Sequence, residues 1–325
     1  MKKLQEVSIL RTFAVITLVA WHSYCSYTSW QIGNSPADDF YRYIFYFLSP
    51  DANMPLFTFL SGYLFAYLLE EKGKYNDFKA FVINKSHRLL IPYLILGFVI
   101  NMTQIDRQNP LELFWGTPNH LWYCLMLFYC FIGCWIVEKK FGMRWNIAVM
   151  LLSFLIVVVM GNQNLMRTPL GVYMPMYYYG YFYIGFLAFR YKEQLLSAVG
   201  KWWWAVLCIY ILTAYFTPLR HFLLITSLSY IALLLKIGNS ERFQQAIVNN
   251  SLINLGIEKI SQYSFGIYVF HQWIIWNMTR YDDFHPFIHE HYILFPLLTW
   301  CLIFFLSYLI THYAVKTRIG RYLLM

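Results

Sequence analysis

The sequence predicts an all-α, polytopic integral membrane protein with about ten transmembrane helices in one bundle. Of its 325 residues, 59% are hydrophobic and only 13% are charged, against about 25% charged in an average soluble protein. The mean hydropathy is +0.45. The apolar residues form continuous runs rather than alternating ones, which indicates helices and not a β-barrel. This composition excludes intrinsic disorder and an ordinary soluble domain.

Ten apolar segments are long enough to cross, or nearly cross, a bilayer. They are residues 8–29, 53–69, 89–104, 120–137, 146–161, 172–189, 202–217, 221–235, 262–278 and 292–315. Two amphipathic stretches, one at 78–85 and one within the polar connection 236–261, are expected to form short helices on the membrane surface. No soluble domain is left over, so residues 1–325 are predicted to form a single transmembrane domain.

The basic residues set the predicted orientation. With a cytoplasmic N-terminus, 20 of the 25 Lys and Arg residues fall on the inner side of the ten segments. The other five are on the outer side, and they are Arg42, Arg107, Arg167, Arg220 and Arg280. Cytoplasmic loops carry such an excess of positive charge. We therefore expect a multi-pass protein of the cell inner (plasma) membrane with both termini in the cytoplasm, and no nucleic-acid partner despite a formal charge of +9.

Neither the cysteines nor the outer histidines indicate a metal site or a disulfide framework. All six cysteines lie in apolar stretches without a Cys-x-x-Cys pair, as expected of small packing residues. The outer loop 280–291 is rich in Asp, Glu and His, but its spacing matches no familiar metal site. The sequence thus predicts no metal cofactor.

Two ionisable residues of the first segment, Arg11 and His22, fall on one helix face. Eleven residues span about three turns and roughly 16 Å along the axis. This places Arg11 at the cytoplasmic end and His22 well inside the bilayer, where an ionisable group is a functional hypothesis by default. The alternative is that Arg11 anchors the helix and that His22 makes a structural hydrogen bond.

Two further polar residues reach a depth similar to that of His22. His271 lies roughly 13 Å into the ninth segment, and Ser61 reaches a comparable level in the second. Together the three side chains suit a shared cavity. A satisfied hydrogen bond between helices is the alternative for each. We favour it for Ser61, which precedes the small residue Gly62, and leave His271 undecided.

Lys85 and Arg88 stand three positions apart at the inner edge of the third segment, on one face. They face the same compartment as Arg11. Converging cations of this kind bind phosphate groups. The excess of positive charge on the inner side explains them equally well without any ligand.

Taken together, these motifs resemble the membrane acyltransferase 3 family. The resemblance rests on Arg11, ten intervening residues and His22, on Pro55-Leu56-Phe57 through Ser61-Gly62-Tyr63, on Lys85-Ser86-His87-Arg88 with Ile91-Pro92-Tyr93, on His120-Leu121-Trp122, and on Ser264-Phe265-Gly266-Ile267-Tyr268 with His271. It runs from the first segment to the ninth. One departure is Lys85, which stands where the family has the first Arg of an Arg-x-x-Arg element. Lysine keeps the charge but loses the bidentate geometry.

The resemblance implies an O-acyltransferase that moves an acyl group, usually acetyl, from cytoplasmic acyl-CoA to a hydroxyl of an envelope or exported glycan. Arg11, Lys85 and Arg88 would hold the CoA phosphates. His22 would act as general base or as transient acyl carrier. His271 and Ser61 are second-rank candidates for lining the site. The family includes members fused to an extracytoplasmic hydrolase-like domain, and this sequence is similar to the standalone ones.

Two other functions stay open at this point. One is a non-enzymatic transporter or flippase of a glycan or lipid-linked sugar, which would not need CoA. It is disfavoured because no Asp or Glu lies within the ten segments. The other is a structural partner of polysaccharide-biosynthesis proteins. The acceptor itself is not identified by the sequence, although outer loops 30–52, 104–119 and 279–291 carry aromatic and amide side chains that suit sugars.

Overall fold

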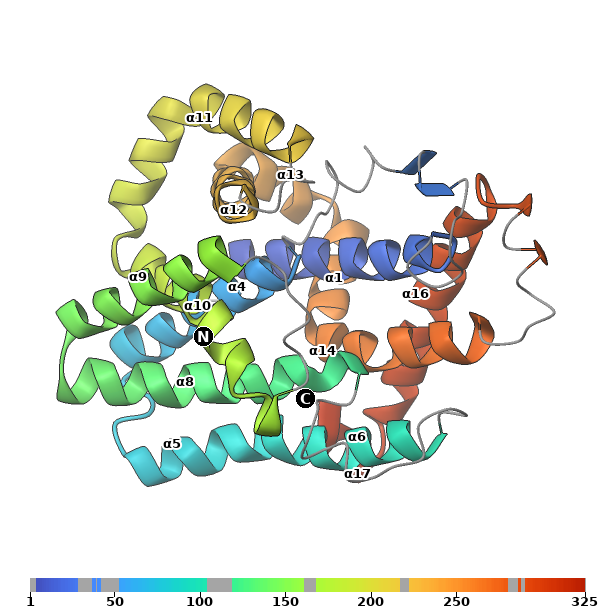
Figure 1. The fold of residues 1–325 in the computed structure, drawn as a ribbon, viewed down its shortest axis with the longest axis horizontal. Coiled ribbons are helices and arrows are strands. Elements are labelled where there is room, and N and C mark those ends of the chain that lie inside the picture. Colours follow the sequence, from blue (N-terminus) through green and yellow to red (C-terminus); the bar gives the residue numbers. More distant parts are fainter. Residues whose placement is uncertain are drawn as a thin grey trace. The chain divides into compact units, whose positions relative to one another are not determined.

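A computed structural model describes residues 4–28, 37–38, 40–41, 53–103, 119–160, 168–216, 222–279, 286–287 and 290–324 (Figure 1). Within these ranges the regular structure is helical and contains no strand, which confirms the predicted all-α class. The chain divides into two compact units. Unit 1 comprises residues 1–53 and 240–325, and unit 2 comprises residues 54–239.

Unit 1 joins the two ends of the chain. Its helices are α1 (Gln5–Cys25), α13 (Glu241–Asn249), α14 (Ser251–Thr279), α16 (Phe295–Ala314) and α17 (Arg318–Leu324). Helix α1 packs against α14 and α16, which also pack against each other. The core-facing side of α1 has helical spacing, with Leu10, Ala14, Leu18 and neighbouring residues buried. Thr12 adds a link between helices, because its hydroxyl donates to the Ile257 carbonyl at 3.0 Å.

Unit 2 contains the remaining helices. They are α4 (Asn53–Ala66), α5 (Phe78–Lys85), α6 (Ile91–Thr103), α8 (Trp122–Lys140), α9 (Met143–Met160), α10 (Tyr173–Arg190), α11 (Lys192–Tyr215) and α12 (Leu223–Gly238). Helices α8, α9 and α10 pack against one another, and α11 pairs with α12 (Figure 1). Two π-helical turns, Tyr67–Glu71 after α4 and Ser86–Leu90 between α5 and α6, were not predicted.

Helices α4 and α10 meet through glycine. A Cβ atom on Gly62 would lie 1.8 Å from the Phe182 carbonyl oxygen, and one on Gly185 would lie 2.1 Å from the Phe59 carbonyl oxygen. Each glycine therefore lets the backbone of the other helix approach directly, as small residues do between membrane helices. The packing interpretation of the Ser61-Gly62 step is confirmed for Gly62.

Each of the ten predicted segments overlaps a helix of the described structure. Among the described residues, five helices are long and apolar enough to cross a membrane, namely Gln5–Cys25, the continuous helix Phe78–Thr103, Trp122–Lys140, Lys192–Tyr215 and Phe295–Ala314. A sixth span is obtained if α12 and α13, bent by 58° at their junction, count as one. Helix α9 also presents exposed large apolar side chains, including Leu151, Leu155 and Val159, which suit contact with lipid. The chain is therefore a membrane protein, and the count of ten spans stays a prediction.

Helix boundaries differ from the expected ones mainly where polar residues extend a helix. The third apolar segment begins at Phe78 instead of 89, because the Asp77 side chain caps α5 by accepting from the Ala80 N–H at 2.7 Å. Helix α11 begins at Lys192 instead of 202, and a break in helical geometry at Trp202 separates its polar and apolar parts. A helix does form in the connection 236–261, as α13.

Candidate functional site

The two histidines that the sequence places at a similar depth in the membrane, His22 and His271, are in contact inside unit 1. His22 Nδ1 on α1 lies 2.9 Å from His271 Nε2 on α14, with ring centroids 5.0 Å apart. His271 is fully buried, whereas His22 is partly exposed. On the far side of its ring, His271 Nδ1 lies 3.0 Å from the carbonyl oxygen of Ile267, one turn earlier on α14. The sequence left the role of His271 undecided, and the structure places its side chain in direct contact with His22.

This chain of bonds orients the protons. A carbonyl oxygen can only accept, so His271 donates its Nδ1–H to Ile267. In the neutral form of His271, Nε2 then accepts from the Nδ1–H of His22. A neutral His22 with its proton on Nδ1 carries its lone pair on Nε2. The arrangement resembles the orienting partners that fix the tautomer of functional histidines elsewhere.

One buried amide next to this pair went unnoticed in the sequence. Gln272 is buried, and neither its amide nitrogen nor its amide oxygen has a hydrogen-bond partner among the described residues. Such groups are rare in native structures and costly when unpaired. Glutamine beside a histidine carries no recognisable pattern in the sequence, so only the burial of its side chain brings it to notice.

The remaining second-rank candidate, Ser61, belongs to α4 in unit 2. Its hydroxyl donates to the Phe57 carbonyl of its own helix at 2.9 Å, which is the satisfied role favoured from the sequence. Arg11 is partly buried on α1 in unit 1, and His22 follows it eleven residues later on the same continuous helix.

Lys85 and Arg88 lie in unit 2 with opposite surroundings. Arg88 is exposed, whereas Lys85 is 7% exposed. The Lys85 ammonium is enclosed by an aromatic cage, which we define as the rings of Phe65, Tyr75, Phe81 and Phe131. Its Nζ lies 3.5 Å from the ring centre of Phe131 and 5.0–5.9 Å from the other three. Cation–π contacts of this kind contribute about 0.5–2 kcal/mol each, most when water is excluded.

Arg88 also acts on this cage. Tyr75 lies in the turn that precedes α5, and its ring forms one wall. Burial raises the pKa of Tyr75, and the positive charge of Arg88 opposes that increase. The charge of Arg88 therefore favours the ionised form of the Tyr75 hydroxyl, against the effect of burial.

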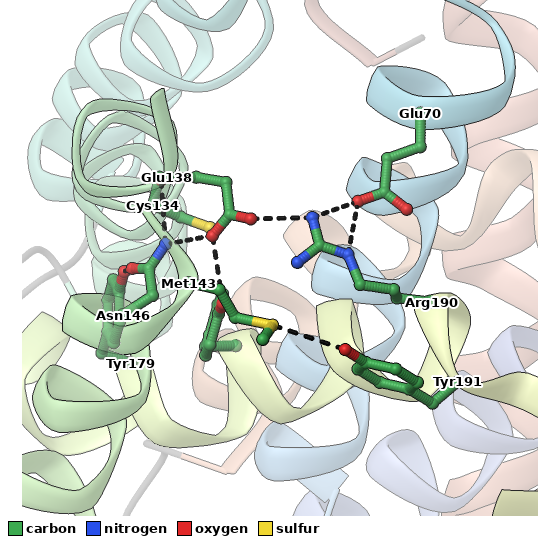
Figure 2. A network of polar contacts seen from close by, with 9 residues as sticks. Glu70, Cys134, Glu138, Met143, Asn146, Tyr179, Arg190 and Tyr191 are labelled. Atoms are coloured by element: carbon green, nitrogen blue, oxygen red, sulfur yellow. Dashed lines mark hydrogen bonds and ion pairs between the residues drawn. The ribbon is translucent and has the colours of Figure 1, made fainter. Parts of the chain in front are cut away.

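A second polar cluster in unit 2 is built on Arg190, at the end of α10 (Figure 2). Arg190 Nε donates to Glu70 Oε1 at 2.8 Å, and its terminal nitrogen donates to Glu138 Oε1 at 2.7 Å. The other Glu138 oxygen accepts from Asn146 Nδ2 at 2.7 Å and from the Tyr183 hydroxyl at 3.0 Å. This carboxylate clamp ties the π-helical turn after α4 to α8, α9 and α10.

The position of Glu138 differs from the one expected from the sequence. The expected fourth segment ended at residue 137 and excluded Glu138, but α8 continues to Lys140. Glu138, with a side chain only 10% exposed, is thus part of the packed helix. Because each of its oxygens accepts bonds from neighbouring helices, it serves packing in the described structure.

Some predicted features fall outside the described residues. These are the five outer arginines and most of the outer loops 30–52, 104–119 and 279–291, including Asp282, Asp283, His285 and His289 of the acidic and histidine-rich stretch. His120, which precedes α8 in the short 3₁₀ turn Asn119–Leu121, is described and is buried.

The structure thus has apolar helices that suit a membrane, and a hydrogen-bonded pair of histidines joins two of its helices, α1 and α14. These features define a membrane protein with a pair of titratable side chains inside its helical core. Comparison with known families then identifies the chain. The family model described as an acyltransferase domain, that of the acyltransferase 3 family, matches residues 4–314, and the chain belongs to this family. It is accordingly a membrane acyltransferase. Searches of curated proteins and of solved structures each gave no match.

Proposed function

We propose that this acyltransferase moves an acyl group, acetyl in the simplest case, from cytoplasmic acyl-CoA to a hydroxyl of an envelope or exported glycan. The hydrogen-bonded pair of His22 and His271 carries the proposal. In an acyltransferase, a histidine whose proton is fixed on Nδ1 offers Nε2 to an acceptor hydroxyl.

The chemical step is a proton transfer coupled to attack on a thioester. His22 Nε2 takes the hydroxyl proton while the acceptor oxygen attacks the thioester carbonyl. A C–O bond forms and the C–S bond breaks. The CoA thiolate leaves and recovers the proton from the His22 imidazolium. His271 accepts from His22 Nδ1–H throughout and so keeps the ring in one orientation.

A second route uses His22 as a covalent carrier. Its Nε2 attacks the thioester first and holds the acyl group as an acyl-imidazole until the acceptor oxygen displaces it. The two routes differ in one observable. Incubation with radiolabelled acyl-CoA and no acceptor labels the protein only if the covalent route operates.

Binding of CoA is assigned to the cytoplasmic edge. The basic side chains Arg11 and Arg88 are proposed to hold its phosphates, since Arg pairs well with phosphate oxygens. Both lie on the side that the distribution of Lys and Arg assigns to the cytoplasm. The pantetheine arm would extend along α1 toward His22, about three helical turns away.

The acceptor is proposed to be a glycan or glycolipid of the cell envelope, presented in the inner membrane by polysaccharide-biosynthesis proteins. The aromatic and amide side chains of the outer loops support a sugar-binding role, since aromatic rings and amides are common in sugar sites. Comparing surface glycans of a deletion strain with those of its parent by mass spectrometry identifies the acceptor through the acyl groups that disappear.

The decisive experiment compares wild type with His22→Gln and His22→Ala in purified, CoA-binding protein. A glutamine amide can still donate to His271 Nε2 but cannot take up a proton at neutral pH. Loss of a general base lowers the transfer rate by about 10²–10⁴-fold. A purely structural hydrogen bond between membrane helices is worth only about 0.6 kcal/mol.

We expect both variants to stay folded, to bind CoA and to be inactive. Transfer by His22→Gln at close to the wild-type rate would show that His22 is structural. Failure of the wild-type protein to bind CoA, measured by thermal stabilisation, would favour a carrier of glycans over an acyltransferase of this kind.

A further inference from the structure

Lys85 and Arg88 have different surroundings in the folded protein. Arg88 presents its side chain at the surface of unit 2, while Lys85 is packed inside it. A phosphate group binds cations that its oxygens can reach for charge-assisted hydrogen bonds. Of Lys85 and Arg88, Arg88 is the one exposed to meet this condition.

The aromatic cage holds Lys85 from four different places in unit 2. Phe65 belongs to α4, Tyr75 to the turn before α5, Phe81 to α5 and Phe131 to α8. The negative faces of the rings attract the ammonium within about 6 Å. The single charge of Lys85 thus links the start of the π-helical turn Ser86–Leu90 to its neighbours.

Arg190, another basic residue of unit 2, differs from Lys85 in having carboxylate partners. Arg190 also stands over a ring of this aromatic core, Phe186, at 5.0 Å, and Phe186 in turn lies 5.8 Å from Phe65. Arg190 is neutralised by the two carboxylates of the clamp (Figure 2). Lys85 has no ion pair among the described residues, so the aromatic rings are the groups around its amine that can stabilise a positive charge. Burying a charge without an acid partner is costly. This cost indicates that Lys85 has a role inside the fold, and that it is more than one of the basic residues of the surface.

The link from Lys85 to Arg88 runs through the helix itself. Arg88 is the third residue of the π-helical turn that begins directly after Lys85. A π-helical turn has i→i+5 hydrogen bonds in place of i→i+4, is less stable than α-helix and is frequent at functional sites. The direction of the Arg88 side chain therefore depends on how the residues before it are held.

We infer that Lys85 is a positioning residue: its ammonium, held in the aromatic cage, fixes the π-helical turn so that Arg88 faces the phosphates of acyl-CoA, and Lys85 makes no phosphate contact. This inference rests on the proposed function, because it assigns Arg88 to CoA. It differs from the expectation drawn from the sequence, in which both residues bind phosphate.

The test is a double-mutant cycle on the full-length purified protein, with CoA as ligand. Lys85→Met keeps the length and apolar body of the side chain but removes the charge. Arg88→Ala removes the proposed phosphate contact. The dissociation constant of CoA is measured by titration calorimetry for both single variants and the double variant, together with each unfolding temperature. Lys79→Met, at an exposed position of α5, is the matched control for loss of one positive charge.

We expect Arg88→Ala to weaken CoA binding about ten- to hundredfold, as for other charge-assisted contacts. Lys85→Met should weaken it to a similar extent when Arg88 is present and leave it unchanged when Arg88 is already alanine. Lys85→Arg, which keeps a cation in the cage, should restore most of the affinity. Lys79→Met should change it less than twofold.

Two results would overturn the inference. An equal loss of affinity from Lys85→Met in both backgrounds would make Lys85 a direct phosphate ligand. A lowered unfolding temperature with unchanged CoA affinity would make it a structural residue only. If Arg88→Ala itself left CoA binding unchanged, the phosphate role in the proposed function would fail, and this outcome is separate from the other two.

A further variant keeps the test valid if Lys85→Met does not fold. Phe131→Leu removes the ring nearest the ammonium, at 3.5 Å, and leaves both basic residues in place. It should weaken CoA binding in the presence of Arg88 and have no effect in its absence. Unchanged CoA affinity in folded Phe131→Leu protein would contradict the proposed role of the cage.

Discussion

His271 is in direct contact with its neighbour His22. It is fully buried and joined on one side to the Ile267 carbonyl and on the other to His22. In the proposed mechanism such a residue does not touch the substrate. Its proposed effect on the reaction comes from the acceptor that it offers to His22 Nδ1–H, which keeps the lone pair of His22 on Nε2.

Replacement of His271 should therefore lower the rate of transfer without affecting CoA. We expect His271→Leu to reduce kcat about 10–100-fold, as for other partners that orient a functional histidine, with KM for acyl-CoA unchanged. His271→Gln should be less impaired, because its amide oxygen can accept from His22. Steady-state kinetics of both purified variants measure this, and equal kcat values for the two would contradict the orienting role.

Both histidines were singled out from the sequence, but their contact was not. Helical rise alone places them at similar depths, since it depends only on counting residues from the membrane edge. The rotation of α1 and α14 about their axes decides whether the rings meet, and that follows from packing of many side chains. Lys85 shows the opposite limit. Its charge and spacing are evident in the sequence, whereas the rings that enclose it come from residues as far away as Phe65 and Phe131.

At the scale of helices, the contact between α4 and α10 makes a sharp forecast. Gly62→Ala places a methyl group against the Phe182 carbonyl, and backbone cannot move aside as a flexible side chain does. We expect a loss of about 3 kcal/mol, at the upper end of overpacking costs, seen as a lower unfolding temperature in detergent.

Gly200→Ala on α11 is the matched control, since nothing lies within 4 Å of the added methyl group. It should leave stability unchanged or raise it by up to about 1 kcal/mol, because alanine favours helix. Equal destabilisation by the two substitutions would mean that α4 and α10 do not pack through their glycines.

The carboxylate clamp provides a second forecast at this scale. Arg190→Met leaves the Glu138 carboxylate, 10% exposed, without its cation, and removing one partner of a buried pair costs about 3 kcal/mol. Glu70→Gln should cost about 1 kcal/mol or less, because that side chain is 29% exposed.

A double variant distinguishes the energy of the Arg190–Glu138 ion pair from the effect of losing either side chain. The double variant Arg190→Met with Glu138→Gln should be more stable than Arg190→Met alone, since it no longer holds an uncompensated carboxylate. Thermal unfolding in detergent of the wild type, Arg190→Met, Glu138→Gln and the double variant measures these differences. Additive losses in the double variant would show that Arg190 and Glu138 contribute independently.

Hydropathy predicted where helices lie better than where they begin. Every apolar segment has most of its described residues in a helix, because a backbone surrounded by lipid must satisfy its own hydrogen bonds. The helices extend beyond those segments because polar residues with good helix propensity, as in Lys192–Lys201 at the start of α11, continue the same hydrogen-bond ladder into water. The π-helical turns have no comparable signal, since they depend on local packing.

For the whole molecule, the sequence predicted one transmembrane domain, which stays a prediction, and the structure describes two compact units. Unit 1 is discontinuous in the chain, since α1 packs with helices more than 200 residues later. Contacts so distant in sequence leave no periodicity that one sequence can reveal. The family match nevertheless covers residues 4–314 and thus includes both units.

The topology is open to a direct test by cysteine labelling of intact cells. Four of the six native cysteines are buried and can remain, while Cys208 and Cys301, which are exposed, are replaced by alanine. Single cysteines are then introduced at three connections, as Asn162→Cys before α10, Arg220→Cys between α11 and α12, and Asn250→Cys before α14. A membrane-impermeant maleimide reports which of them face the outside.

The distribution of basic residues predicts that Asn162→Cys and Arg220→Cys are labelled in intact cells and that Asn250→Cys is labelled only after permeabilisation. Labelling of Asn250→Cys in intact cells would reverse the orientation and place Arg88 on the wrong side for cytoplasmic acyl-CoA. Arg220→Cys decides a separate point. If it requires permeabilisation while Asn162→Cys does not, α11 and α12 form a re-entrant hairpin, eight spans replace ten, and both termini still face the cytoplasm because the number of crossings stays even.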